Sequence, residues 1–420
     1  MKLKYSYLAL ILCLIFSQSC SDGYEHYDGI YMSSTLGNNP MVTVIVDDVF
    51  PKELDITVAS TTLVDEDVTV ELKADPAMVA AYNKKFGTLY EPLPENCYAL
   101  SQPTAVIQKG NYANTAPIKL NIISSEGMVD GVKYMVPVSI KNVSGGHKVI
   151  EASRTIYAAT NQIIVEPALH LIGSQYAIAQ FWQPGEGVVL PYDVSKLPKV
   201  TMEARVFIDE IDASSKLNTI FGLEENFVVR TTSEAGKKGQ LELAGGGINN
   251  VITADPFPLN AWTHLAVVYD GNETGKGKVT IYVNGEVQAS MDVTRTAKEI
   301  PMVSLHAQYM QSWDVPGGAS GATFVYENAP FWIGKSERAR YLHGSVSEAK
   351  IWAKALTQAE VKANMCITDP TSNLLIAYWR FNNGGDDEKT FQDLTGHGFD
   401  MKLSAGSASW TQNVKCPENY

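Results

Sequence analysis

The sequence is poor in cysteine and in basic residues, and it has no long apolar run. It holds 5 cysteines in 420 residues, and its 46 acidic residues outnumber 33 basic ones, for a net charge of −13. A surface this acidic repels phosphate backbones, so we expect no nucleic-acid partner. Hydrophobic residues make up 45% of the chain without any low-complexity tract, which predicts two or three domains with their own cores.

The first nineteen residues, MKLKYSYLALILCLIFSQS, have the organisation of an export signal. Lys2 and Lys4 precede an apolar run that ends at Phe16, and small polar residues follow. The run is shorter than the roughly 20 apolar residues that a membrane-spanning helix needs. We therefore expect residues 1–19 to be removed as a signal peptide, which makes the remaining chain two charges more acidic.

Cys20 directly follows this segment. The Ser19-Cys20 step resembles a bacterial lipobox, in which the cysteine is acylated and becomes the mature N-terminus, although Ser17 stands where Leu or Val is usual. The alternative is an ordinary cleaved signal followed by an incidental cysteine. The resemblance implies a lipid anchor at Cys20, with residues 20–35 as a polar tether.

The other cysteines constrain the fold little. Cys13 lies in the signal segment, and Cys97, Cys366 and Cys416 are an odd number, so at most one disulfide can form among them. Cys366 and Cys416 belong to the same predicted domain, and the sequence leaves open whether they pair. The spacing of the cysteines is not typical of a zinc site.

The N-terminal region has the pattern of a β-sandwich. Short segments that alternate apolar and polar residues, separated by turn residues, predict strands. These segments are 41–48, 53–60, 67–74, 104–111, 117–123, 134–143 and 154–160. One helix is expected between them, with Asp75 as its N-cap, Pro76 in its first turn and Gly87 at its end.

Three features of this region carry a family resemblance: the Tyr82-Asn83 pair, the Leu93-Pro94 step and the strand end at Lys109-Gly110. They resemble the N-terminal domain of unknown function that many Bacteroidetes surface lipoproteins carry ahead of a glycoside hydrolase or lectin-like module. The resemblance covers residues 25–160 and implies an immunoglobulin-like spacer or platform without established chemistry. We place this domain at residues 36–162.

Residues 163–420 form the second predicted domain. The stretch THLAVVYDGNETGKGKVTIYVNGE contains two alternating strands, and its Asn284-Gly285 step predicts a type I′ turn. Further on, Thr357 and Glu360 predict a capping box at the start of a short helix.

Several blocks of this domain, in this order, resemble the laminin-G and pentraxin-like branch of the concanavalin A-type jelly rolls. They are WTHLAVVYDG, VTIYVNG, HGSVSEAKIWAKALT and the pair YWRFN and DLTGHG. The resemblance implies an all-β chain, in which an immunoglobulin-like β-sandwich precedes a concanavalin A-like jelly roll. Such domains frequently bind glycans or proteins, sometimes with calcium, and some relatives are glycanases, so the fold does not decide the function.

Candidate catalytic groups are few. A glycanase needs two carboxylates facing a cleft, and jelly-roll glycanases of the laminarinase type place them as Glu-x-Asp-x-x-Glu on one strand. Glu210-Ile211-Asp212 begins this pattern, but Ser214 and Ser215 stand where the second Glu should be. No Gly-x-Ser-x-Gly elbow occurs between a predicted strand and a helix. We expect a protein that is not an enzyme, with a glycoside hydrolase as the less favoured alternative.

A structural calcium ion is the one cofactor that the resemblance leaves open, and none is required. Asp393 and Glu348 are the acids nearest to the family's metal-associated positions, whereas Ser347 replaces an Asp that is usual there. Carboxylate and turn carbonyl oxygens are the ligands that calcium prefers. The alternative is that Asp393 hydrogen-bonds its own turn.

The clearest ligand candidates lie in an aromatic stretch, residues 304–334. Sugar recognition sets an aromatic ring against the C–H face of the sugar, with polar groups for the hydroxyls. The first half of the stretch has this inventory, and we predict a ligand-binding rim of His306, Gln308, Tyr309, Gln311, Trp313 and Asp314. A second candidate is Trp182 in FWQPGEG. The alternative is an insertion that packs its aromatics over the edge of the sandwich.

Other aromatic residues have the pattern of packing positions. Phe331, Trp332 and Ile333 lie in one predicted strand and are expected in the core. The same holds for Trp262, Trp352 and Trp379, and His264 is expected to be structural.

The sequence as a whole predicts a lipid-anchored lipoprotein of the outer membrane, exposed at the cell surface. We expect it to capture a polysaccharide without cleaving it, in a polysaccharide-utilisation system beside outer-membrane transport and hydrolase proteins. The alternative is a laminin-G-like module for protein binding or adhesion, in which the rim aromatics form a hot spot.

Overall fold

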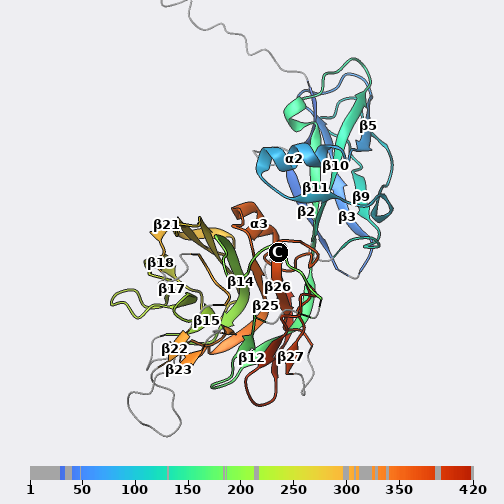
Figure 1. Cartoon of the computed structure of the whole chain (residues 1–420). Coiled ribbons are helices and arrows are strands. Elements are labelled where there is room, and N and C mark those ends of the chain that lie inside the picture. The colour runs from blue at the N-terminus through green and yellow to red at the C-terminus, as the bar shows by residue number, and fades with distance from the viewer. Residues whose placement is uncertain are drawn as a thin grey trace, which may run out of the picture.

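The chain folds into two β-sandwich modules, and strands account for 49% of the residues that the structure describes. The structure is a computed structural model that describes residues 29–33, 40–47, 49–129, 132–182, 185, 187–211, 217–296, 302–306, 309–311, 324–326, 330–336, 340–383 and 389–417. The last strand of the first module ends at Gln162 and the first strand of the second begins at Ile164, so a single residue joins the modules. Figure 1 shows them one above the other.

The N-terminal module contains eleven of the described strands and one α-helix. Its elements are β1 (Ile30–Met32), β2 (Met41–Val46), β3 (Lys52–Ile56), β4 (Val58–Ser60), β5 (Val68–Ala74), α2 (Met78–Phe86), β6 (Tyr90–Pro92), β7 (Tyr98–Leu100), β8 (Thr104–Ile107), β9 (Ile118–Ile122), β10 (Lys133–Val143) and β11 (Thr155–Gln162). A sheet in the order β2-β11-β10-β5-β8, with β6 beside β10, packs on the sheet β3-β9-β7, while β1 pairs with β4. Val70 and Val138 of the first sheet share a buried core with Leu120 of the second.

The predicted strands of this module are confirmed, but two predictions at its edges are wrong. β1 lies inside the segment expected to be a tether, because Ile30 pairs with Ser60, so the folded domain begins earlier than predicted. The helix starts two residues later than expected: Ala77 is its N-cap and makes no side-chain capping bond. Asp75 instead forms an ion pair with Lys73, at 2.7 Å. The end at Gly87 is as predicted, with a left-handed φ of 63°.

The C-terminal module is a larger sandwich. Its elements are β12 (Ile164–Leu171), β13 (Ala177–Ala179), β14 (Lys199–Ile208), β15 (Thr219–Leu223), β16 (Phe227–Thr231), β17 (Gln240–Gly245), β18 (Ile248–Pro256), β19 (Thr263–Gly271), β20 (Lys276–Val283), β21 (Glu286–Thr294), β22 (Tyr309–Gln311), β23 (Phe324–Tyr326), β24 (Phe331–Ile333), β25 (Gly344–Trp352), α3 (Gln358–Ala363), β26 (Leu375–Arg380), β27 (Thr390–Phe391), β28 (Met401–Leu403) and β29 (Ser409–Cys416). The back sheet has the order β21-β20-β19-β14-β25-β12-β29, with β26 beside β25. The front sheet has the order β18-β17-β16-β15-β24-β13-β28-β27.

The two sheets enclose the main hydrophobic core. Phe331 of the front sheet stacks on Trp379 of the back sheet, with ring centroids 5.8 Å apart. Strand β14 shows how the sequence specifies this arrangement, because Met202 and Ala204 point into the core whereas Glu203 lies on the opposite face. Every residue from Val200 to Val206 is nevertheless buried. Strand β14, at the centre of the back sheet, is therefore covered on both of its faces, whereas the edge strand β21 has no buried residue.

Helix α3 and the loop after it form the outer cover of the back sheet. Val361 and Ile367 pack there on Trp352 and Tyr378, in a second hydrophobic cluster. The capping box that begins α3 is confirmed: the Thr357 side chain accepts from the Glu360 N–H, and the Glu360 carboxylate accepts from the Thr357 N–H.

Buried charges beneath this cover have partners. The Lys350 ammonium donates to Glu348 at 2.9 Å and to the carbonyl oxygen of Asn364 at 2.6 Å. Trp352 Nε1 donates to the Glu203 carboxylate at 2.7 Å. These contacts stabilise the charged groups, which would be costly to bury alone.

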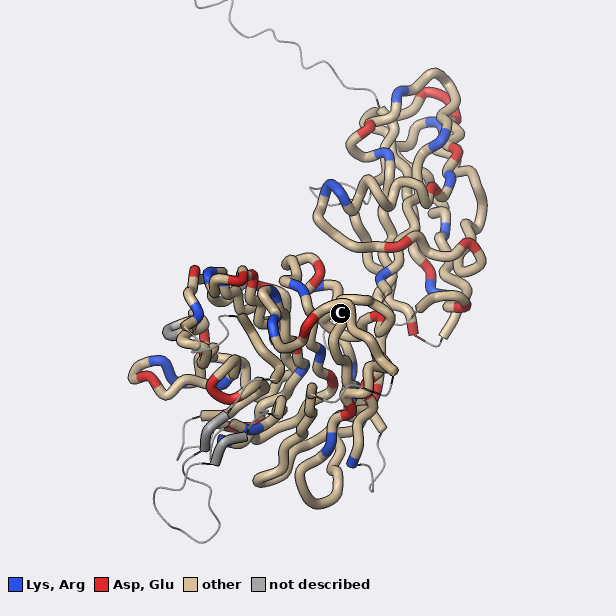
Figure 2. Tube along the Cα trace, in the orientation of Figure 1, with Lys and Arg blue, Asp and Glu red and all other residues tan. Residues whose placement is uncertain are grey.

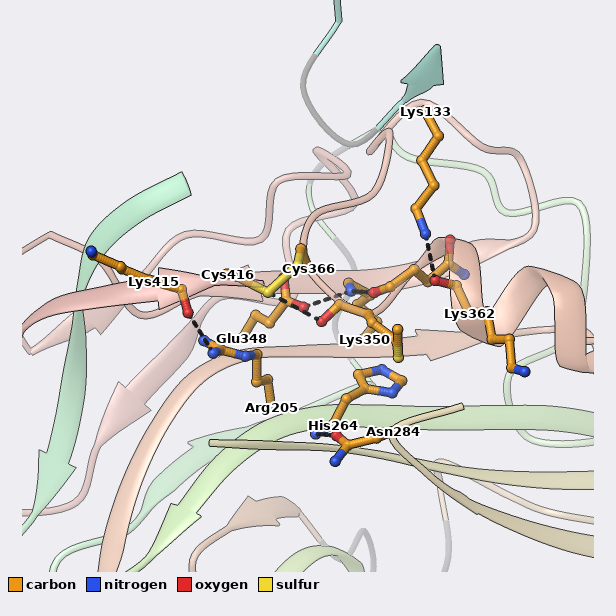
Figure 3. Close-up of a disulfide and its surroundings, with 12 residues drawn as sticks. Lys133, Arg205, His264, Asn284, Glu348, Lys350, Lys362, Cys366, Lys415 and Cys416 are labelled. Carbon is orange, nitrogen blue, oxygen red and sulfur yellow. Dashed lines mark hydrogen bonds and ion pairs between the residues drawn. A yellow bond between two sulfur atoms is a disulfide. The ribbon is translucent and has the colours of Figure 1, made fainter. Parts of the chain in front are cut away.

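Cys366 and Cys416 form a disulfide, with their Cα atoms 5.6 Å apart. The pairing that the sequence left open is thereby decided: the bond ties the loop after α3 to the last strand, β29 (Figure 3). Cys97 is free and buried.

The predicted packing residues are partly confirmed. Trp379 lies in the main core and His264 is buried, whereas Trp352 belongs to the cluster under α3. The prediction for Trp262 is wrong, because its half-buried ring lies under the guanidinium group of Arg205, 4.9 Å from the ring centroid. The Asn284-Gly285 turn has φ values of 49° and 75°, as a type I′ turn requires.

Removal of the disulfide should destabilise the second module. The bond closes a loop with a sequence separation of 50 residues, and loss of such a bond costs about 2–4 kcal/mol, mainly because the unfolded chain gains freedom. We expect reduction of the wild-type chain to lower its denaturant midpoint, whereas a Cys366→Ser, Cys416→Ser double variant should start low and not respond to reductant. An unchanged midpoint of the reduced wild-type chain would contradict this role.

Candidate functional site

Two of the predicted ligand segments meet at one end of the C-terminal module. His306 Nε2 donates to the carbonyl oxygen of Phe181 at 2.9 Å, although the two residues are 125 positions apart. Trp182 follows Phe181 directly and is half-buried, as is His306. The structure thus brings together His306 and Trp182, two candidates that sequence reasoning found independently.

The rest of the predicted rim belongs to a hairpin. Strand β22 pairs with β23, with Tyr309 opposite Tyr326 and Gln311 opposite Phe324. The hairpin forms a two-stranded sheet of its own, so Phe324–Tyr326 pairs with the predicted rim and not with the front sheet that contains β24. Gln308, Trp313 and Asp314 lie outside the described residues, and a ligand role for the rim stays a prediction.

The loop DLTGHG lies against the same end. The N–H of Gly185 donates to the carbonyl oxygen of His397 at 2.7 Å. A Cβ at Gly185 would come within 3.3 Å of that oxygen, so a side chain here would force the backbones apart. Tyr192 is nearby: its hydroxyl donates to the carbonyl oxygen of Leu375, and burial, with the Asp393 charge, raises its pKa to about 12. Sequence reasoning missed Tyr192 because no motif surrounds it.

The outer face of the front sheet carries an aromatic group that we call the aromatic face: Tyr176, Trp332, Lys335 and Tyr341. The rings of Tyr176 and Trp332 meet edge to face at 6.2 Å, and those of Tyr176 and Tyr341 stack at 6.4 Å. The Lys335 ammonium lies over both Tyr176 and Trp332, at 4.5 and 5.0 Å from the ring centroids. Such cation–π contacts orient the lysine toward this face.

The position of Trp332 corrects a prediction. Phe331 and Ile333 belong to the main core, as expected, but Trp332 forms a separate cluster with Tyr176 and Ile178 on the opposite face. Because side chains alternate along a strand, three consecutive residues cannot all point inward. The period of two was a signal in the sequence that could have placed Trp332 correctly.

The aromatic face and the rim candidates share one strand pair. Trp332 on β24 lies opposite Ile178 on β13. Tyr176 precedes β13 and Trp182 follows it, while the β22–β23 hairpin precedes β24. A ligand that lies along β13 and β24 would therefore extend from the aromatic face toward the rim.

The carboxylate of Asp393 is fully engaged in its own loop. Its Oδ1 accepts from the N–H of Tyr378 at 3.1 Å and from the N–H and hydroxyl of Thr395 at 3.1 and 2.7 Å. Its Oδ2 accepts from the N–H of Phe399 at 3.2 Å. These donors stabilise the negative charge without a metal.

Glu348 is engaged as well. Its two oxygens accept from the Lys350 ammonium at 2.9 Å and from the Tyr378 hydroxyl at 3.1 Å. A calcium ion at Glu348 would lie close to that ammonium, and the described residues contain no group of three or more His, Cys, Asp or Glu side chains placed to hold a metal. The carboxylates of Asp393 and Glu348 therefore do not fit a calcium site.

Comparison with protein families decides the nature of the second module. Residues 186–304 match the laminin-G type model of the concanavalin A-like lectin/glucanases superfamily. The C-terminal module has a concanavalin A-like fold. Residues 24–147 match a family model described as an N-terminal domain, which precedes the concanavalin A-like domain in the chain. Among curated proteins, none has a sequence that matches this chain.

Solved structures are similar to this chain to different degrees. A candidate carbohydrate-binding protein from Bacteroides ovatus is 23% identical, covers 92% of this chain and 98% of its own, and has a TM-score of 0.54. A SAP-like pentraxin from Limulus polyphemus is 16% identical over 47% of this chain and 80% of its own, with a TM-score of 0.30. Domain 4 of an extracellular arabinanase from Geobacillus stearothermophilus, in complex with arabinotriose, is 19% identical over 48% of this chain and 88% of its own, with a TM-score of 0.29.

Helices long and apolar enough to cross a membrane are absent from the described part of the chain.

Loss of the Asp393 charge should destabilise the concanavalin A-like domain. In the wild-type chain, the N–H groups of Tyr378, Thr395 and Phe399 all donate to the carboxylate of Asp393. An Asp393→Asn variant offers these donors a neutral amide instead, so we expect a loss of about 1–3 kcal/mol in the free energy of unfolding. Asp369→Asn is the matched control, because Asp369 accepts two hydrogen bonds from Thr371 in an exposed turn. Chelator should leave the melting temperature of the wild-type chain unchanged, and a fall on chelation would restore calcium as the ligand of Asp393.

Proposed function

We propose that this protein captures a glycan on the aromatic face of its concanavalin A-like domain and does not cleave it. The observation that carries the proposal is the group of Tyr176, Trp332 and Tyr341 on the outer face of the front sheet. The half-buried rings of Tyr176 and Tyr341 provide flat apolar surfaces for the C–H faces of sugars, and the buried ring of Trp332 supports Tyr176 from within the group. Lys335 adds hydrogen-bond donors beside them.

Three further observations support this proposal. His306 and Trp182 add a polar and an aromatic side chain at the end of the same strand pair. The concanavalin A-like family includes lectins and glucanases by its description. The Bacteroides ovatus structure, which has the same fold over nearly the whole chain, is that of a candidate carbohydrate-binding protein.

The absence of cleavage is also a proposal, supported by the position of the acids at the end of β14. The exposed carboxylate of Glu210 contacts His343 Nδ1 at 3.3 Å, rather than a second carboxylate. Glycoside hydrolysis needs two carboxyl groups about 5–10 Å apart across the sugar. Asp212 lies outside the described residues.

We further propose that Cys20 is acylated after removal of residues 1–19 and anchors the protein in the outer membrane, facing the medium. The disulfide supports export, because such bonds persist in oxidising compartments. At this location the protein would hold a polysaccharide near transport and hydrolase proteins of a polysaccharide-utilisation system, which raises the local concentration of their substrate. Cys20 and the segment before it lie outside the described residues.

A glycan array on the exported chain with Cys20→Ser tests the main proposal. We expect binding to at least one polysaccharide, and a Tyr341→Ala variant should weaken it about tenfold or more, since a stacked ring contributes about 1–2 kcal/mol. Tyr112→Ala removes an equally large ring that is 55% exposed in the other module, and should leave affinity unchanged. Retention by no polysaccharide would contradict the proposal and favour a protein ligand.

Two more measurements separate the rim from the face and binding from cleavage. Trp313→Ala should also weaken retention while it leaves the melting temperature nearly unchanged, if Trp313 belongs to the rim. A fall of several kcal/mol in the free energy of unfolding would show instead that Trp313 is packed. Release of reducing ends from a bound polysaccharide would overturn the proposal that the protein does not cleave its ligand.

The anchor has a test of its own. The wild-type chain, expressed in its natural type of host, should fractionate with outer membranes and be labelled on intact cells. Cys20→Ser should release the chain in soluble form, because the residue at position 20 can then no longer carry the lipid anchor. Membrane retention of the Cys20→Ser chain would argue against lipidation at this position.

A further inference from the structure

A groove of about 740 Å³ lies between the two modules, away from the aromatic face. Its N-terminal wall includes Phe86, Leu89 and Tyr90, from the end of α2 and the loop that follows. Its C-terminal wall includes Glu286, Gln358 and Lys362, from β21 and α3. Figure 1 shows α2 and α3 on the facing sides of the junction.

The N-terminal wall is fixed by Asn83, which belongs to the Tyr82-Asn83 pair that the sequence analysis singled out. Asn83 Oδ1 accepts from the N–H of Tyr90 and from the hydroxyl of Thr88, both at 2.9 Å. Its Nδ2 donates to the carbonyl oxygen of Tyr90 at 2.7 Å. One side chain thus holds the loop before Tyr90 in a single shape, and the rings of Phe86 and Tyr90 both contact Tyr82 below them.

The C-terminal wall is also preorganised. Gln358 Nε2 donates to the carbonyl oxygen of Gly285 at 2.9 Å, and the Lys362 ammonium pairs with Glu286 at 2.6 Å. Gly285 is required here, because its φ is positive and a Cβ would lie 2.5 Å from Lys362 Cγ. Walls held in this way lose little freedom when a ligand binds.

The modules are tied together at the groove. The connecting residue, Ile163, donates its N–H to the carbonyl oxygen of Val46 at 3.0 Å, which extends the β2–β11 pairing of the N-terminal module as far as the junction. Lys133 of β10 donates from its ammonium to the carbonyl oxygen of Lys362 at 2.9 Å, across the junction (Figure 3). The groove therefore has walls from both modules and a lysine that bridges them.

Lys133 is the unusual group in this groove. Burial lowers the pKa of its ammonium. Among the described residues, that ammonium has one hydrogen-bond acceptor, the Lys362 carbonyl oxygen, and no carboxylate within ion-pairing distance. A lysine ammonium has three N–H donors, so two remain for a ligand. The nearby carboxylate of Glu286 is already paired with Lys362.

We propose that the groove is a second ligand site, which binds an acidic oligosaccharide through the carboxylate of a uronic acid at Lys133. The rings of Phe86 and Tyr90 would accept the C–H face of a sugar, and the amide of Gln358 lies in reach of its hydroxyls. An anionic group stabilises the partly buried ammonium, whereas a neutral sugar does not. This site stands apart from the aromatic face and does not depend on the function proposed for it.

The acidic character of the whole chain does not oppose this assignment. Among the described residues, the charged ones that line the groove are Lys133, Lys362 and Glu286, which together carry one more positive than negative charge. Acidic and basic residues are spread over both modules (Figure 2). At physiological ionic strength, exposed charges farther away than about 8 Å are largely screened, so the local lysine decides the preference.

Calorimetry on the exported chain with Cys20→Ser tests the proposal. The probes are trisaccharides of galacturonic, glucuronic and mannuronic acid, each compared with its methyl ester, which has the same rings without the charge. We expect at least one acid to bind, its ester to bind about tenfold or more weakly, and added salt to reduce the affinity of the acid. Failure of all three acids to bind, or equal affinity for acid and ester, would overturn the proposal.

Variants locate the site. Lys133→Gln keeps a donor for the Lys362 carbonyl but removes the charge, and should weaken binding of the acid about tenfold or more, while Lys133→Arg should retain most of it. Lys109→Gln is the matched control, because Lys109 is exposed in the same module and does not line the groove. Unchanged affinity of Lys133→Gln would contradict the proposal.

Two controls keep this result distinct from other causes. Tyr341→Ala should leave the affinity for the acid unchanged, and a parallel loss would place that ligand on the aromatic face instead. Small-angle scattering compares the arrangement of the modules in wild type and Lys133→Gln. If the arrangement changes, the Phe86→Ala variant decides, because it leaves the bridge between Lys133 and Lys362 in place. This variant must then weaken binding of the acid, and unchanged affinity would contradict the proposal.

Discussion

The structure depends on one constraint, the burial of the central strands of the back sheet on both of their faces. One face of β14 packs on the front sheet through Met202 and Ala204, and the other lies under α3 and the loop after it. A strand that is buried on both faces also buries the polar side chains of its outer face. The buried carboxylate of Glu203 is therefore stabilised by a hydrogen bond from the indole N–H of Trp352. The disulfide holds this cover down, because it ties the loop to β29 at the edge of the sheet.

The position of α3 on the back sheet determines which surfaces of the module can meet a ligand. Since α3 occupies the outer face of the back sheet, the outer face of the front sheet is where aromatic side chains such as Tyr176 and Tyr341 can meet a ligand. The same helix forms one wall of the groove between the modules, through Gln358 and Lys362. One structural element therefore stabilises the concanavalin A-like domain and shapes a surface that is separate from its aromatic face.

Sequence reasoning succeeded where local chemistry decides the structure. The turn at Asn284, the capping box at Thr357 and the helix end at Gly87 follow from the conformations that these residues prefer, and all three are present. It failed where distant contacts decide. The Asp75 N–H donates to the carbonyl oxygen of Pro137 in β10, and Trp262 packs under Arg205 rather than in the core.

The sequence by itself determined the class of the protein: two β-rich modules, and His306 and Trp182 among the candidates for ligand contact. Alternation of apolar residues and turn chemistry act over a few positions, so they can be recognised in the chain. The tertiary structure decided which of these residues meet, as when the His306 imidazole contacts the carbonyl group beside Trp182. It also decided the disulfide, because sheet order brings Cys366 and Cys416 together. The bridge between Lys133 and Lys362 likewise depends on the single residue that joins the modules and keeps them close.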